Sequence, residues 1–307
     1  MSGIGIDVCK HSLDVAVFRG QTRQFTNTAG GHRKLVDWLN TLSVRQVVLE
    51  ATGGYELAAL DALHHAALPV ARVNAQRARN LANGLGLAKT DRLDAAMLAC
   101  MAEKMELHRY VPLEPWQRDL GEHVRARRQL VDLLKTAKLQ LLQVVEKPLR
   151  KLLQSNVNQL TRSVARLDKL IAGQLETLLT EQPHLAALKT LKGVGPVLLA
   201  VLACRLPELG TLSGKQISRL VGVAPLSRDS GAMRGKRGIG GGRADIRQAL
   251  YMAAMSSARH EPRLRDFYRA LRARGKEGKV ALVAVMRKML VILNARVRDE
   301  RAAMQPA

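Results

Sequence analysis

Four carboxylates in the first third of the chain have the types and spacing to do chemistry together. Asp7 lies near the end of the apolar stretch GIGIDV, and Glu50 ends a second apolar stretch in VVLEA. Asp91 and Asp94 lie three residues apart in KTDRLDAAMLA, so a helix would carry both on one face. Carboxylates gathered at one point repel each other unless a divalent cation neutralises them. Oxygen ligands favour Mg²⁺ or Mn²⁺, and two such ions roughly 4 Å apart stabilise the attacking and leaving oxygens of phosphoryl transfer.

Each of these acids also has an ordinary structural explanation. An aspartate at a strand end often caps a turn, and Asp91 follows Thr90 at an expected helix start, where the helix dipole favours negative charge. Lys89 and Arg92 offer ion-pair partners. As a set, placed on two strand ends and one helix of a basic protein, the four carboxylates favour metal-dependent phosphate chemistry.

A second candidate is the glycine- and arginine-rich stretch PLSRDSGAMRGKRGIGGGR, from Pro225 to Arg243. Its composition indicates an electropositive clamp for a nucleic-acid backbone. Ser227 and Ser230 could bind phosphate oxygens there, whereas a nucleophilic serine would need activation by a base or by cations. From spacing alone, the clamp is the favoured interpretation of both serines. The expected nucleic-acid contacts in this stretch are Arg228, Arg234, Lys236, Arg237 and Arg243.

The stretch LKGVGPVLLAVL has the form of a helix-hairpin-helix. Two short apolar helices would flank a glycine-containing turn whose backbone N–H groups can face a phosphate. We therefore expect nucleic-acid contacts at Lys192, Gly193 and Gly195. The turn ATGGYE after Glu50 could also approach a phosphate, although paired glycines more often mark a tight turn.

The candidate residues need elements that position them. Residues 3–27 alternate like three short strands, and RQVVLEA and LPVARVN indicate later strands with helices between them. This pattern predicts a mixed α/β sheet of about five strands within a first domain, residues 1–112. Residues 113–185 are expected to form a helical assembly segment, a coiled coil or antiparallel hairpin interrupted at Pro148 and at SNVN. An ordinary helical bundle is the alternative for that segment, and residues 186–307 are expected to form a basic, mainly helical domain.

The charge of the chain indicates a polyanionic partner. The 307 residues carry a formal net charge of +23, of which +16 falls within residues 186–307. Nucleic acid is the first candidate partner and an acidic membrane surface the second. Aromatic residues make up only 3% of the chain, so stacking of bases on aromatic side chains should contribute little.

The cellular location is expected to be cytoplasmic. The N-terminal MSGIGIDVCK has neither the basic nor the apolar region of a signal peptide, and apolar runs such as VGPVLLAVLAC are too short to span a bilayer. Cys9, Cys100 and Cys204 are far apart in sequence and form no CxxC motif. They indicate reduced thiols and no structural zinc.

Five motifs occur in the order found in one known family. They are GIDVCKHSLDVAV, VVLEATGGYE, AKTDRLDAAMLA, LKGVGPVLLAVL and VGVAPLSRDSGAMRGKRGIG. Over nearly its whole length the chain resembles the bridge-RNA-guided insertion-sequence recombinases, or DEDD transposases, to which the pilin-gene invertases are related. The first three motifs alone suggest a RuvC-like domain of the RNase H fold, and their combination with APLSRDSG is specific to this family.

The resemblance implies a catalytic role for five residues. Asp7, Glu50, Asp91 and Asp94 match the family's DEDD tetrad, which binds Mg²⁺ and can accept Mn²⁺. Ser230 matches the serine that attacks a DNA phosphodiester and forms a covalent phosphoserine link. Strand exchange then reverses this attack on a different strand, which conserves the bond energy without ATP.

The resemblance also implies partners and an assembly. A structured non-coding RNA pairs with target and donor DNA, so base pairing recognises sequence and the protein holds backbones. The RuvC-like domain of one subunit meets the serine domain of another, the long helices mediate assembly, and dimers pair into tetramers. The expected setting is the cytoplasm of a bacterium, at the nucleoid when the enzyme is active.

The chain departs from the family pattern at two places. Cys9 stands where many members have serine, which should matter little because Asp7 is intact. GIGGGR is unusually rich in glycine where we expect a lysine near Gly242. The cation that activates Ser230 is therefore open among Arg234, Lys236, Arg237 and Arg243.

Two alternative functions follow from the same residues. A hydrolytic RuvC-like nuclease, such as a junction resolvase, would use Ser230 only to grip phosphate, and would release free DNA ends without a protein–DNA adduct. A non-catalytic nucleic-acid-binding protein would use its acids as caps and ion-pair partners. Its binding would not respond to a chelator, and it would cleave nothing.

Overall fold

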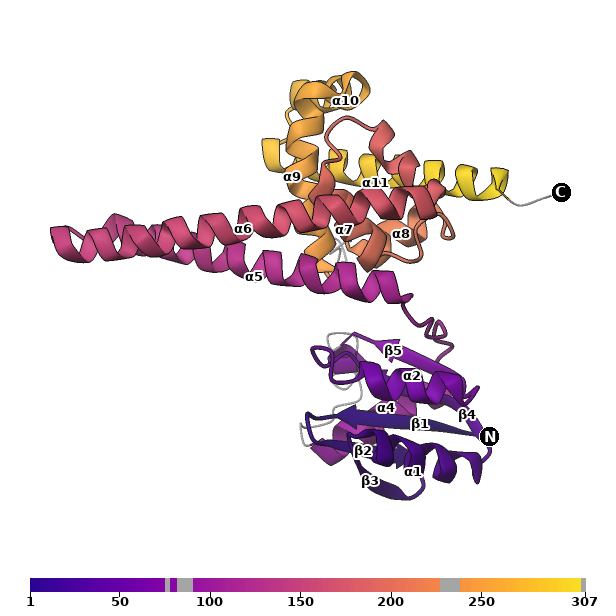
Figure 1. The fold of residues 1–307 in the computed structure, drawn as a ribbon. Helices are drawn as coiled ribbons and strands as arrows, with labels where there is room; N and C mark the ends of the chain where they lie inside the picture. Colours follow the sequence, from indigo (N-terminus) through magenta and orange to yellow (C-terminus); the bar gives the residue numbers. More distant parts are fainter. Residues whose placement is uncertain (75–77, 82–90, 227–237, 305–307) are drawn as a thin grey trace, which may run out of the picture. The chain divides into compact units, whose positions relative to one another are not determined.

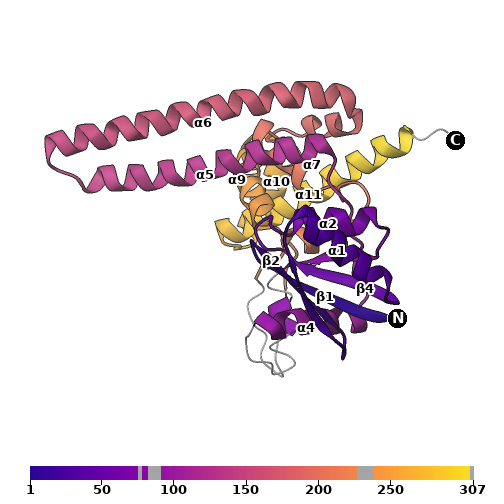
Figure 2. The same ribbon diagram turned by 60° about the horizontal axis from the view of Figure 1, so that its bottom comes forward.

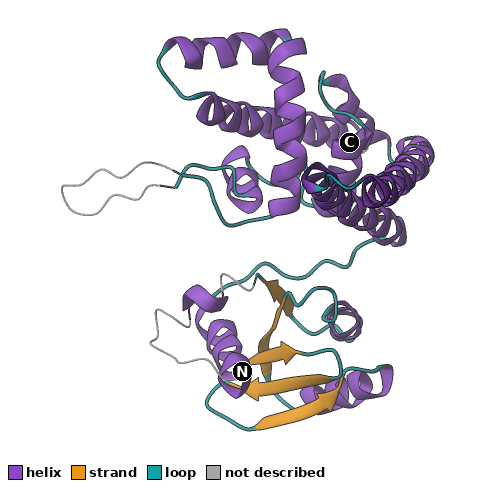
Figure 3. Ribbon diagram, turned by 90° about the vertical axis from the view of Figure 1, so that its left-hand side faces the viewer, coloured by secondary structure: helices purple, strands orange, loops and turns teal. Residues whose placement is uncertain are grey.

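The computed structural model describes residues 1–74, 78–81, 91–226 and 238–304, with only the backbone at 91–93. The chain divides into two compact units, Met1–Pro112 and Leu113–Ala307. Figure 3 shows that the named strands belong to the first unit and that the second is built from helices.

The first unit contains a five-stranded mixed sheet in the order β3-β2-β1-β4-β5. β1 pairs antiparallel with β2, which pairs antiparallel with β3, while β1–β4 and β4–β5 are parallel pairs. The prediction of a meander followed by alternating helices and strands is confirmed. The strands are β1 (Ser2–Val8), β2 (Ser12–Val17), β3 (Thr22–Thr26), β4 (Val44–Glu50) and β5 (Val70–Val73).

Helices cover both faces of this sheet (Figure 2). Successive residues of a strand face opposite sides, and β4 shows this directly. Val47 and Leu49 pack with α1 (Ala29–Asn40) and α2 (Leu57–His65), whereas Val48 packs with α4 (Asp91–Lys104).

α4 lies unusually close to β1 because glycines occupy the strand where the two cross. A Cβ atom added at Gly5 would lie 2.1 Å from the carbonyl oxygen of Ala95 and 2.2 Å from the nitrogen of Ala99. No side chain fits at that distance, so the GIGIDV sequence both forms the strand and admits the helix backbone.

The second unit begins with two long helices, α5 (Pro115–Gln143) and α6 (Lys147–Glu181). They lie side by side in Figures 1 and 2, and an ion pair joins Arg127 Nε to Asp168 Oδ1 at 2.5 Å. Pro148 lies in the first turn of α6, where its missing N–H costs no hydrogen bond. The expected interruption at SNVN was wrong, because these residues continue the helix.

The remaining elements pack around the base of the long hairpin. Leu120, Ile171, Leu175 and Leu178 join the same hydrophobic core as the helices that follow. The base of the hairpin is therefore part of this compact unit, and the separate assembly segment at 113–185 stays a prediction. The elements are η1 (Pro183–Thr190, a 3₁₀ helix), α7 (Pro196–Arg205), α8 (Gly214–Val221), α9 (Ala244–His260), α10 (Pro262–Ala273) and α11 (Gly278–Ala303).

No helix within the described ranges is both long and apolar enough to cross a membrane.

Candidate active site

Asp7 and Glu50 lie at the carboxyl ends of neighbouring parallel strands. The last residues paired between β1 and β4 are Ile6 and Leu49, and each acid follows immediately. Ile6 and Leu49 pack in the core under α1 and α2, so the alternation of the strands directs Asp7 and Glu50 to the opposite face, which α4 covers. Val8 N donates a hydrogen bond to Asp7 Oδ1 at 3.0 Å.

The glycines of β1 show which part of α4 this face meets. A Cβ at Gly3 would lie 2.4 Å from Glu103 N and 2.7 Å from Ala99 O, whereas a Cβ at Gly5 meets Ala95 and Ala99. An advance of two residues along β1, about 6.6 Å, therefore matches an advance of roughly one turn, about 5.4 Å, along α4. The next residue on this face of β1 is Asp7, and the preceding turn of α4 begins with Asp91 and contains Asp94.

The described side chains do not test whether the four predicted acids form one cluster. Among them, no three His, Cys, Asp or Glu residues lie close enough together to hold a metal ion. The side chain of Asp91, one of the four, falls outside the described part. The backbone therefore brings the strand ends and the start of α4 to one face, while the metal-binding tetrad stays a prediction.

Glu56 holds the turn that follows Glu50, and the sequence analysis missed it. Its side chain is fully buried and its Oε2 accepts hydrogen bonds from Thr52 N at 3.1 Å and Gly54 N at 2.8 Å. Its Oε1 pairs with the guanidinium of Arg72 on β5. A buried carboxylate needs such partners. The sequence signal for this contact was the glutamate that ends ATGGYE together with the arginine of LPVARVN, its ion-pair partner.

The KGVGP turn presents only part of its backbone to solvent. Ser257 Oγ donates to Lys192 O at 2.7 Å, and a Cβ at Gly193 would lie 2.1 Å from that Oγ. Gly193 is required here by its φ of 102° and by this close approach to α9. Lys192 and Gly195 are exposed, and Gly195 caps the start of α7. The first flanking element is the 3₁₀ helix η1, so the helix-hairpin-helix remains a prediction.

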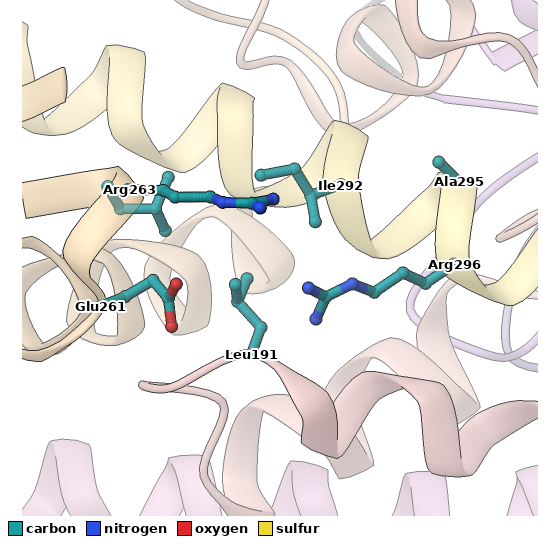
Figure 4. A pocket seen from close by; sticks show the side chains of 7 residues that line it. Leu191, Glu261, Arg263, Ile292, Ala295 and Arg296 are labelled. Carbon is teal, nitrogen blue, oxygen red and sulfur yellow. The ribbon is translucent and has the colours of Figure 1, made fainter.

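A pocket of about 380 Å³ lies beside this turn (Figure 4). Arg263 from α10 and Arg296 from α11 extend from opposite sides toward the middle of the pocket, and the carboxylate of Glu261 lies on the side of Arg263. Arg296 Nη1 donates to Thr190 Oγ1 at 2.5 Å. The apolar side chains that line the pocket are Leu191, Leu264, Ile292 and Ala295.

Exposed cations continue from this pocket along α10 and the turn that follows it, a feature that the sequence analysis did not single out. We call them the α10 surface: Arg263, Arg269, Arg272, Arg274 and Lys276. The helix is anchored by Leu264, which is fully buried. Within the described part of the chain, no carboxylate pairs with these five cations. Alternation of arginines with the apolar positions of 262–273 was the sequence signal for this face.

The serine segment lies outside the described residues. Ser227, Ser230, Arg228, Arg234, Lys236 and Arg237 all fall in 227–237. The residues that flank it are paired with each other, because Leu226 N donates to Gly238 O at 2.8 Å. The chain thus enters and leaves this segment at one place.

Arg243 is engaged by the protein itself. Its two terminal nitrogens lie 2.7 Å and 2.5 Å from the carboxylate oxygens of Glu208, and Nη1 also donates to Arg205 O at 2.8 Å. A bidentate pair of this kind fixes the guanidinium plane. Arg243 is therefore bound by Glu208 in this structure, and its expected contact with a nucleic-acid phosphate stays a prediction.

Comparisons with known proteins identify both units. A transposase model of the DEDD, IS110 type matches residues 4–148, and a model described as "Transposase IS116/IS110/IS902 family" matches residues 185–269. The first model implies an RNase H-like fold, with which the mixed sheet agrees, and dependence on a divalent metal.

Relatives of known name are similar over nearly the whole chain. The pilin gene-inverting proteins of Moraxella bovis and Moraxella lacunata are each 29% identical to it, over 97% of this chain and 96% of theirs. The insertion element IS900 uncharacterized 42 kDa protein of Mycobacterium paratuberculosis is 31% identical over 49% of this chain and 39% of its own length. Two transposase models and two relatives matched end to end agree: the chain belongs to the IS110-type transposases and is an enzyme of DNA recombination.

Proposed function

We propose that the enzyme is an RNA-guided, site-specific DNA recombinase that joins itself to DNA through Ser230, assisted by Mg²⁺ at Asp7, Glu50, Asp91 and Asp94. The observation that carries the metal site is the close packing of α4 on β1. Gly3 and Gly5 of β1 each contact a successive turn of α4. Continuing this pattern by two strand residues pairs Asp7 with the turn that contains Asp91 and Asp94. Glu50 follows the β4 residue paired beside Ile6.

The donor set suits a hard divalent cation. All four proposed ligands are carboxylates, which Mg²⁺ and Mn²⁺ prefer, and together they carry enough negative charge to require a cation when close. When bound, the metal neutralises charge that develops on the attacking and leaving oxygens of the phosphodiester. The buried Glu56 would keep the turn after Glu50 in place, and the main-chain N–H of Val8 would orient the Asp7 carboxylate.

The proposed covalent step exchanges one ester for another. The Oγ of Ser230 forms a bond to phosphorus as its proton leaves, and the bond from phosphorus to the departing DNA oxygen breaks. That oxygen takes up a proton and becomes a hydroxyl. In the second step a hydroxyl of another strand attacks the phosphoserine, and the proton returns to Ser230. No water is consumed and no ATP is needed, because one phosphoester is present throughout.

We further propose that the site is completed between subunits, with dimers that pair into tetramers. The support is an apolar surface near the far end of the α5–α6 hairpin. Leu142 is 77% exposed, Val145 92% and Leu152 61%. Apolar side chains clustered on a projecting hairpin are typical of a protein–protein contact. We define Leu139, Leu142, Val145, Leu149 and Leu152 as the hairpin tip.

The proposed guide is a structured RNA that pairs with both DNA partners. The family resemblance motivates this part, and the excess of positive charge with few aromatic residues supports a protein that holds nucleic-acid backbones. DNA flanking the coding region provides the direct test. A structured non-coding segment with complementarity to both element ends is the expected finding, and flanks with no such complementarity would count against a guide RNA.

Substitution of the serine tests the covalent mechanism. Ser230→Ala should abolish the covalent protein–DNA adduct, detected as a species that survives denaturing electrophoresis, while DNA and RNA binding persist. Ser227→Ala, in the same segment, is the matched control and should retain the adduct. An undiminished adduct in Ser230→Ala would overturn the assignment, and Mg²⁺-dependent free DNA ends without any adduct would indicate the hydrolytic nuclease instead.

A further inference from the structure

Asn27 joins the two loops that carry the strand-end acids. Its side-chain Nδ2 donates hydrogen bonds to Cys9 O at 3.0 Å and to Tyr55 O at 3.1 Å. Cys9 follows Asp7 by two residues, and Tyr55 lies in the turn after Glu50. The main-chain N–H of Asn27 also donates to His11 O at 3.0 Å. One residue between β3 and α1 therefore bridges the segments that leave β1 and β4.

His32 fixes the orientation of this amide. Its Nε2 lies 2.7 Å from Asn27 Oδ1. The amide NH₂ faces two carbonyls, so Oδ1 is the acceptor and the ring nitrogen Nε2 carries the hydrogen. His32 is only 7% exposed, and burial lowers its pKa. A neutral imidazole protonated at Nε2 satisfies this geometry.

The bridge lies where the sheet no longer joins the two strands. The pairing of β1 with β4 ends at Ile6 and Leu49, one residue before each acid. Beyond that point the Asn27 amide connects the loop after β1 to the loop after β4. Within the second of these loops, Glu56 makes further hydrogen bonds. Because both hydrogen bonds come from one amide nitrogen, they limit how far the two loops can separate.

We propose that Asn27, oriented by His32, is a positioning residue that sets the spacing of Asp7 and Glu50 for the divalent metal. The inference rests on the proposed metal site. Asn27 itself binds neither metal nor DNA, and acts by holding the carbonyls of Cys9 and Tyr55 at one distance. Loss of the bridge leaves the carboxylate ligands present but less well spaced, which lowers the affinity for the metal. A higher metal concentration should therefore restore occupancy of the site.

Metal binding to the full-length protein tests this role directly. Mn²⁺ affinity is measured by electron paramagnetic resonance, and thermal unfolding is followed on the same samples. Asn27→Ala should weaken Mn²⁺ binding about tenfold and shift the Mg²⁺ dependence of adduct formation to higher concentration, with the maximal yield retained. Gln24→Ala, which removes a side-chain hydrogen bond to Asp14 on the same sheet, is the control and should bind Mn²⁺ normally.

Changes at His32 separate positioning from simple packing. His32→Gln keeps a side-chain N–H that can donate to Asn27 Oδ1 and should retain most of the affinity, whereas His32→Leu keeps the bulk without the donor and should lose it. Equal Mn²⁺ affinity in His32→Leu and in the unchanged protein would overturn the proposal. This comparison decides the matter even if Asn27→Ala fails to fold.

A further variant distinguishes failure of this inference from failure of the metal site. Asp7→Asn should abolish Mn²⁺ binding if the tetrad is the metal site. Binding lost in Asp7→Asn but unchanged in folded Asn27→Ala refutes the bridge alone. Binding unchanged in Asp7→Asn refutes the proposed metal site, and with it the inference.

Discussion

At the scale of single residues, two polar side chains, one buried and one half-buried, hold the loops at the carboxyl edge of the sheet. Glu56 secures the turn after Glu50, and Asn27 links that turn to the loop after Asp7. These residues do no chemistry in the proposed mechanism. Their contribution is to limit the positions that the neighbouring carboxylates can adopt.

Removal of the Glu56 carboxylate should destabilise the first unit. Glu56→Ala leaves two backbone N–H groups and the Arg72 guanidinium without their partner. We expect a loss of about 1–3 kcal/mol in the free energy of unfolding, because partly buried N–H groups without a partner cost about that much, whereas water can hydrate the exposed Arg72 guanidinium. Urea unfolding measures this difference. Glu106→Ala, at another acid of the same unit with no partner role in this turn, should change stability far less.

At the scale of elements, the contact between β1 and α4 determines whether the strand ends and the helix start share one face. Gly5→Ala should disrupt it, because the new Cβ would lie within 2.2 Å of two main-chain atoms of α4. We expect a loss of about 1–3 kcal/mol in stability, together with weaker metal binding. Gly30→Ala is the control, since nothing lies within 4 Å of its added Cβ. Chemical unfolding and Mn²⁺ titration of both variants check the prediction, and equal behaviour would contradict it.

The hairpin tip should control the assembly of subunits. Leu142→Glu combined with Leu152→Glu introduces two charges on side chains that are exposed in the single chain. We expect smaller assemblies with unchanged helix content, measured by sedimentation and circular dichroism. Met252→Glu alters another exposed apolar side chain, on α9, and should leave the assembly size unchanged. Assembly unaffected by the double substitution would show that subunits meet elsewhere.

Periodic patterns in the sequence predicted the structure better than local propensity or single polar residues did. Strand alternation predicted the five-stranded sheet, because burial of one face of a strand imposes a period of two. SNVN was read as an interruption from local propensity, yet packing of α6 along α5 keeps it helical. Asn27 and Glu56 were missed because their hydrogen bonds join segments that are distant in sequence or lie within one irregular turn.

At the scale of the whole molecule, positive charge is concentrated in the second unit, where the α10 surface is exposed. The triple substitution Arg269→Gln, Arg272→Gln and Arg274→Gln should weaken binding to DNA and RNA of any sequence. Each lost phosphate contact lowers the slope of log affinity against log salt by about 0.7–0.9, so we expect a drop of about 2–3.

A variant of the same net charge provides the control for that prediction. Arg33→Gln, Lys34→Gln and Arg298→Gln removes three exposed cations elsewhere. Affinities measured by fluorescence anisotropy over a range of salt concentrations compare the two. If both variants lose the same slope, the α10 surface has no special role and only total charge matters. Separate measurements with duplex DNA and with folded RNA show which nucleic acid uses this surface.

The hydrogen-bonded pair Leu226 and Gly238 has a practical consequence for protein engineering. A segment whose two ends are fastened together behaves as a cassette, since its replacement need not displace α8 before it or α9 after it. Segments of other lengths, taken from relatives with different joining activities, can be exchanged at these two residues. Under the proposed serine mechanism, such chimaeras would make strand joining a transferable property, separable from the proposed metal site and from the α10 surface.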